Sequence, residues 1–213
     1  MQWMVQHMSI IYRLTILSLC LCIFVSLCLS KVAAATYPSE LKVAPVKVYE
    51  SILTNFKEKK YASVKTAITF IDPIIGAVNT EFGIDLSPEI QSGLKARDEG
   101  FNVSIRRLIF YDIRLMFTVI SKGEEKGEEN RQRVLFKMAY ANYCLLSTEL
   151  LSDSANFDLD RKVRKMFTKA YLDLGKESPY GKKTPSDINS FKVHANEIIN
   201  ELTRVVAGFE DVK

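Results

Sequence analysis

The stretch RRLIFYDIRLMF, residues 106–117, places one aspartate inside a run of aromatic and aliphatic side chains. An α-helix turns by about 100° per residue, and on that spacing Asp112 lies near the centre of a wide apolar arc. Three arginines, Arg106, Arg107 and Arg114, fall on the other side. The segment is therefore predicted to be a central helix that is apolar nearly all round. The apolar arc consists of Phe101, Ile105, Leu108, Ile109, Leu115, Met116, Val119 and Ile120.

A buried carboxylate such as Asp112 is costly unless it is paired or hydrogen-bonded. The arginines of its own helix point away, so Asp112 needs a partner on another helix or must take up a proton. We interpret it as a structural polar contact that fixes helix register; a functional carboxylate and a more exposed helix face are the alternatives. Asn142 and Glu149, on the apolar side of the next long segment, complete the candidate buried polar residues.

Helical periodicity continues along the chain after residue 40, and no alternating β-branched run bounded by turns predicts a strand. Glycine and proline are sparse and fall between the helical patterns. We therefore predict an all-α domain, a single helical bundle of six to seven helices. The expected helices lie near 40–60, 62–81, 88–97, 101–122, 127–152, 158–174 and 186–207.

Three helix boundaries carry capping signals. Ser87 and Thr184 each precede a proline and are expected to be N-caps, and Asp187 adds a capping-box-like start at the second site. Asp72 also precedes a proline. Either Asp72 is the N-cap of a short helix that begins at that proline, or the helix over 62–81 runs through it with a kink.

The first 35 residues have the parts of an export signal. Arg13 supplies the positive start, residues 14–30 are an uncharged apolar run, and the sequence VAAAT offers a cleavage site after Ala35. An uncleaved anchor is the alternative, because the run has the minimum length for a membrane span. We expect a signal peptide over 1–35 and an all-helical domain over 36–213. Such a domain is exported, to the periplasm or another extracytoplasmic lumen in a bacterium, and is secreted in another organism.

Removal of this segment changes the charge and the cysteine content of the chain. The full sequence has 29 basic and 25 acidic residues; the segment holds two of the basic ones and no acid, so the net charge falls from +4 to +2. Such a small excess gives little support to nucleic-acid binding. Three of the four cysteines also lie in the segment. The exported domain keeps Cys144 alone and therefore has no internal disulfide.

Residues that most catalytic or metal sites require are missing from this domain. It keeps one histidine, His194, so two Glu-x-x-His helices of a di-iron bundle cannot be built. No spacing places Cys144 beside His194 as a nucleophile pair or a zinc site. The acidic stretch 153–162 lacks the glycine and glutamate of a calcium loop, and no glycine-rich phosphate loop occurs. We expect no cofactor, no metal site and no catalytic residue.

The segment 158–174 is amphipathic, and its polar face is strongly basic. A solvated face explains such a charge run; an acidic protein partner or an anionic membrane surface are the alternatives. An acidic loop over 121–130 is a complement for this face on a second copy of the chain. We expect the basic residues to point away from the core. The candidate partner-binding residues are Arg161, Lys162, Arg164, Lys165 and Lys169 on the helix, and Glu124, Glu125, Glu128 and Glu129 in the loop.

These observations favour a non-catalytic, exported helical subunit that binds protein partners or associates with itself, within a larger assembly. The argument rests on the shortage of catalytic side chains and on the charged surface, because a helical fold alone does not imply a function. A helical bundle that binds a small ligand or a metal through its buried polar groups is the alternative, and an enzyme comes third.

Overall fold

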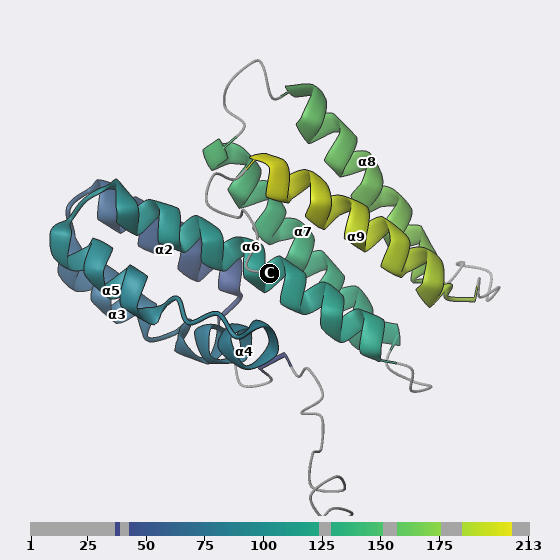
Figure 1. Ribbon diagram of the computed structural model, residues 1–213, viewed down its shortest axis with the longest axis horizontal. Coiled ribbons are helices and arrows are strands. Elements are labelled where there is room, and N and C mark those ends of the chain that lie inside the picture. The colour runs from purple at the N-terminus through teal and green to yellow at the C-terminus, as the bar shows by residue number, and fades with distance from the viewer. Residues whose placement is uncertain (1–36, 39–42, 124–128, 151–156, 176–184, 206–213) are drawn as a thin grey trace, which may run out of the picture. The chain divides into compact units, whose positions relative to one another are not determined.

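The computed structural model describes residues 37–38, 43–123, 129–150, 157–175 and 185–205, all within one compact unit, Ala35–Lys213. In these ranges the protein forms eight α-helices and no strand, which confirms the all-α prediction (Figure 1). The helices are α2 (Pro45–Lys57), α3 (Tyr61–Ile68), α4 (Asp72–Phe82), α5 (Ser87–Ala96), α6 (Glu99–Lys122), α7 (Glu129–Leu150), α8 (Phe157–Asp173) and α9 (Ile188–Val205).

The eighth helix arises because the segment predicted as one helix over 62–81 is two, α3 and α4. The chain turns between them through hydrogen bonds that span three residues instead of four. Phe70 N donates to the carbonyl of Ala67, and Ile71 N donates to that of Ile68. The following Pro73 has no N–H group to continue the helical ladder. None of the described helices is by itself long and apolar enough to span a membrane. The α3–α4 pair meets the length and composition only when both are counted together, and it is bent by 54°.

The starts of three helices differ in detail from the predicted ones. Ser87 is the first residue of α5 and not its N-cap, a position that Leu86 occupies without a side-chain bond, and the Ser87 N–H donates to the carboxylate of Asp85 at 2.9 Å. Helix α9 begins after Asp187, whose Oδ1 accepts from two backbone N–H groups at 3.1 and 3.0 Å. Thr184 lies outside the described residues. Asp72 is the first residue of α4 and not its N-cap, a position that Ile71 occupies.

Helix α6 is the central helix, as the opening stretch predicts. It packs against α2, α4, α5, α7 and α9, and fourteen of its 24 residues are buried. Its arginines turn away from Asp112, also as predicted. Arg106 pairs with Glu99, Arg107 pairs with Glu89, and the guanidinium of Arg114 lies over the ring of Phe82. The carboxylate of Asp112 is therefore left to partners on other helices.

Helices α7, α8 and α9 form the rest of the unit, and α8 carries the basic residues that are the candidate partner-binding residues. Helix α8 packs along α9 and also contacts α7, while α9 contacts α6 (Figure 1). The buried face of α8 consists of Val163, Phe167 and Ala170, at the three- and four-residue spacing of an amphipathic helix. This packing leaves the opposite, basic face of α8 toward solvent.

Candidate functional site at the α7–α8 surface

An aromatic cluster joins α7 and α8. Phe136 and Tyr140 lie one turn apart on α7, and Phe167 and Tyr171 lie one turn apart on α8, so each pair occupies one helix face. The ring centroids of Phe136 and Phe167 are 5.7 Å apart, those of Tyr140 and Phe167 5.2 Å, and those of Phe136 and Tyr171 5.6 Å. These are the separations of favourable aromatic contacts, so the rings pack against one another across the two helices.

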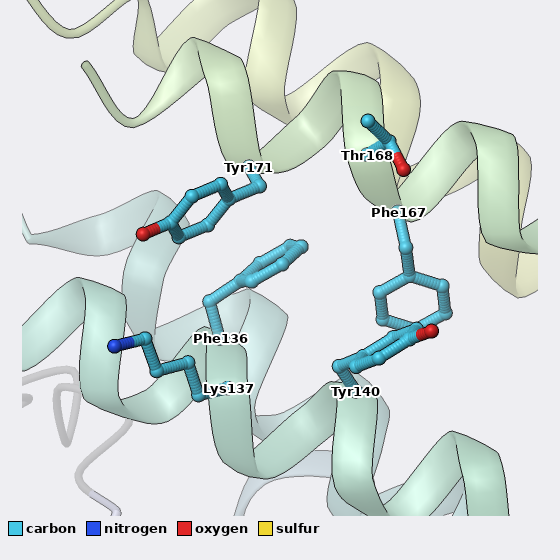
Figure 2. Close-up of a pocket in the computed structure, with 6 residues that line it drawn as sticks. All are labelled: Phe136, Lys137, Tyr140, Phe167, Thr168 and Tyr171. Carbon is cyan, nitrogen blue, oxygen red and sulfur yellow. The ribbon is translucent and has the colours of Figure 1, made fainter. Parts of the chain in front are cut away.

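The same rings line an open pocket of about 440 Å³ on the surface. Lys137 and Thr168 complete its lining, and Figure 2 shows their polar ends on opposite sides of the rings. The Thr168 hydroxyl donates to the carbonyl of Arg164 at 3.0 Å. The Lys137 ammonium has no hydrogen-bond or ion-pair partner among the described residues. The pocket is thus an apolar cavity with an unpaired cation at its rim.

A polar network centred on Asp160 fixes α8 against α7 beside this pocket. Its carboxylate accepts from the hydroxyls of Tyr143 at 2.6 Å and Ser147 at 2.7 Å, and from Arg164 Nε at 2.7 Å. Arg164 also donates to the Tyr140 hydroxyl at 3.1 Å. Burial disfavours the charged carboxylate, but the bonds from Arg164, Tyr143 and Ser147 outweigh it and hold the pKa of Asp160 below its usual value.

The five predicted basic residues of α8 divide into two groups. Three of them pair within the protein. Arg161 reaches Asp158 at 2.9 Å, Lys162 reaches Glu201 of α9 at 2.9 Å, and Arg164 binds Asp160. The expectation that Arg164 points away from the core is wrong, because its guanidinium is drawn into the network between α7 and α8. Lys165 and Lys169 are exposed and have no ion-pair partner among the described residues.

The predicted acidic complement lies mostly beyond the described part of the chain. Glu124, Glu125 and Glu128 fall outside it. Glu129 is described: it is the first residue of α7 and its side chain is exposed. The contact of this loop with the basic face of a second copy of the chain therefore stays a prediction.

Asp112 and Asn142 meet in the core, where Asn142 Nδ2 donates to Asp112 Oδ2 at 2.8 Å. Tyr49 of α2 donates its hydroxyl to the same oxygen at 3.0 Å. The Tyr37 hydroxyl lies close enough to affect the carboxylate, although no hydrogen bond of normal geometry joins them. The side chain of Glu149 lies outside the described residues. The polar contact thus links α2, α6 and α7.

The burial of Asp112 changes its proton affinity. Its side chain is fully buried, and this burial raises the pKa of the carboxyl from 3.8 to about 7, against the opposing effect of Tyr49, Tyr37 and Asn142. Burial also raises the pKa of both tyrosine hydroxyls, so they stay protonated and act as donors. The four pockets described in this protein are lined by other residues, so Asp112 borders none of them.

Cys144 and His194 occupy separate surroundings. Cys144 on α7 is partly buried, with its sulfur 3.6 Å from Arg164 Nη1. His194 on α9 places Nδ1 2.6 Å from the carboxylate of Asp173. No group of three histidine, cysteine or acidic side chains in the described ranges has the arrangement of a metal site.

The fold and this surface define an all-α domain with one hydrogen-bonded carboxylate in its core and an aromatic pocket between two helices. No protein-family model matches the sequence. Comparisons with curated proteins and with solved structures likewise found no match. The functional argument therefore rests on the residues of this chain.

Proposed function

We propose that the protein is a non-catalytic, exported helical domain that binds an acidic protein partner across the α7–α8 surface. The observation that carries this proposal is an aromatic pocket with one unpaired cation at its rim, Lys137, next to a helix with two further lysines that are exposed and unpaired in the described part of the chain. The pocket lies between α7 and α8, and Lys137, Lys165 and Lys169 lie on the same two helices without ion-pair partners in the described structure.

Each part of this surface suits a different step of binding. Protein interfaces are anchored by aromatic residues in desolvated pockets, and the rings of Phe136, Tyr140 and Tyr171 offer such a place for one apolar side chain of a partner. Lys137 at the pocket rim and the exposed Lys165 and Lys169 of α8 attract an acidic surface and orient its approach. The Asp160 network holds the two helices together, so the pocket is formed before the partner arrives.

Reversing the unpaired charges on α8 tests this proposal. In Lys165→Glu/Lys169→Glu we expect partner association to slow by about tenfold or more, because electrostatic attraction accelerates encounter. The wild-type association should also weaken as salt is added. The measurement is cross-linking and quantitative co-purification from the native exported fraction, with circular dichroism to check that the fold is kept.

The matched control is Lys65→Glu/Lys95→Glu, which makes the same charge change on the exposed faces of α3 and α5. It should leave association unchanged. A third variant, Thr168→Trp, fills the pocket without changing the charge and should also reduce association. If Lys165→Glu/Lys169→Glu and Thr168→Trp both keep the same co-purifying proteins and the same self-association as the wild type, the α8 face is a solvated face and this proposal is wrong.

The exported location is a separate part of the proposal and has its own test. We expect N-terminal sequencing of the native protein to find a mature chain that begins just after Ala35. Cleavage there retains Tyr37, which is buried against the core and lies close to Asp112. Recovery of chains that still begin at Met1, in the membrane fraction, would show that the segment is an anchor.

A further inference from the structure

A second pocket is lined by residues of α2, α3, α6 and α7 and by the residues that follow α2 and α5. Its volume is about 680 Å³, and both polar and apolar side chains line it. Three of the residues that line it are cations. Lys57 ends α2, Lys59 follows that helix, and Arg97 follows α5. They come from chain segments about 40 residues apart and line one cavity.

The positive charge of this pocket is not neutralised from within it. None of the three cations has an ion-pair partner in the described ranges. The two carboxylates that line the pocket are already engaged, Glu50 with Lys47 at 2.9 Å and Glu99 with Arg106 at 3.2 Å. An incoming anion would therefore meet cations that have no competing internal partner.

Two of these cations stand at backbone positions that favour glycine. Lys59 has φ 60° and Arg97 has φ 58°, and they are the non-glycine residues with positive φ in the described chain. This left-handed conformation costs a side-chain-bearing residue about 1 kcal/mol. Both exceptions line the same pocket, which is the pattern expected where a side chain is retained for its chemistry.

Arg97 is held over an aromatic ring. Its guanidinium carbon lies 4.5 Å from the ring centroid of Tyr61, another residue that lines the pocket. Stacking on the ring fixes the guanidinium plane and leaves its N–H edges available. A planar guanidinium with free edges matches two oxygens of a phosphate or sulfate group.

Helix dipoles explain only part of this arrangement. A cation in the last turn of a helix is favoured by the negative end of its dipole, and Lys57 fits that description. The dipole does not require basic residues at both left-handed positions, where glycine would end the helices with less strain. We propose that this pocket binds an organic anion that carries a phosphate or sulfate group, held by Lys57, Lys59 and Arg97.

The glycine variants make this proposal testable without damage to the fold. In Lys59→Gly/Arg97→Gly the two cations are lost while the backbone strain is relieved, so the melting temperature should stay the same or rise. Titration of the full protein with pyrophosphate and with sn-glycerol 3-phosphate, at constant ionic strength, should show saturable binding to the wild type. Each cation removed should weaken binding about tenfold, as expected for one charge-assisted hydrogen bond.

Lys65→Gln/Lys95→Gln is the matched control, because it removes two exposed charges that do not line the pocket. It should bind both probes as the wild type does. Equal affinity of the wild type and the glycine variant would overturn the proposal, and so would the absence of saturable binding to the wild type. Neither result bears on the α7–α8 surface, which Lys165→Glu/Lys169→Glu tests separately.

Vesicles distinguish the two sources of such an anion. Wild-type protein is mixed with vesicles of phosphatidylcholine alone or with added phosphatidylglycerol. If it sediments with the anionic vesicles and sn-glycerol 3-phosphate displaces it, the site holds a lipid headgroup. If the soluble probes bind and the vesicles do not, the site takes a soluble phosphate compound. Both results support the anion site, and failure of every probe contradicts it.

Discussion

Gly93→Ala is expected to lower the free energy of unfolding by about 2 kcal/mol, although it adds a single methyl group. A Cβ atom built on Gly93 would lie 2.6 Å from the backbone nitrogen of Phe101 and 2.7 Å from its Cα. Both atoms belong to the backbone of α6 and cannot rotate away. The ring of Phe101 also stacks on Phe56 at 4.3 Å, so a shift of α6 would disturb the core.

Gly76→Ala makes the same substitution in another helix and is its matched control. Gly76 lies in α4, it is exposed, and a Cβ built there meets nothing within 4 Å. The substitution should therefore stabilise the protein by about 0.5–1 kcal/mol through the lower entropy of the unfolded chain. Urea denaturation followed by circular dichroism measures both changes. Similar effects of the two variants would mean that α5 and α6 do not approach as closely as the structure places them.

The sequence was sufficient to predict the central helix, because periodicity is a local property. The apolar arc around Asp112 follows from residues within about six turns of one helix, and so does the orientation of Arg106 and Arg114. The sequence does not decide whether the chain breaks between α3 and α4, since the proline after Asp72 is compatible with a kink as well as with a new helix. The structure resolves this through the turn at Phe70 and Ile71.

The partners of Asp112 could not be predicted, because they come from distant parts of the chain. Tyr49 is 63 residues away in sequence and Asn142 is 30 residues away. Periodicity places a residue on a face but does not say which helix covers that face. The two pockets were missed for the same reason, since each combines residues from helices whose packing the pattern does not specify.

The basic face of α8 could have been interpreted better from the sequence. Asp158 precedes Arg161 by three residues and Asp160 precedes Arg164 by four, which are the spacings of ion pairs along a helix. Those spacings alone identify two of the five cations as paired. The third pair, Lys162 with Glu201, joins α8 to α9 and required the tertiary structure.

Asp112→Asn is expected to give the largest change in the free energy of unfolding, and the size of this change depends on pH. The folded protein holds the Asp112 proton up to a pH of about 7, whereas an unfolded aspartate releases it near 3.8. Between these values the folded state binds more protons than the unfolded chain, so stability falls as the pH rises through this window and is constant above it. A pKa rise from 3.8 to about 7 corresponds to about 4 kcal/mol of lost stability.

The substitution removes the charge and keeps the shape of the side chain. In Asp112→Asn the oxygen can still accept from Tyr49 and Asn142, which both donate to Asp112 Oδ2 in the wild type. The variant has no proton to release, so its stability should not fall over this range on account of residue 112. We therefore expect it to be more stable than the wild type at pH 8, by up to about 4 kcal/mol, with the difference shrinking toward pH 4.

Urea denaturation at a series of pH values from 4 to 8, on the wild type and two variants, measures this effect. Asp72→Asn is the matched control, because it removes the same charge from an exposed position at the start of α4. It should follow the wild-type pH profile. Asp160 and Asp187, whose pKa values are lowered, stabilise the fold above pH 3.8 and lose that effect only in more acidic solution. If the stability of the wild type and of Asp112→Asn changes with pH in the same way, Asp112 is ionised in the folded protein and its hydrogen bonds fully compensate its burial.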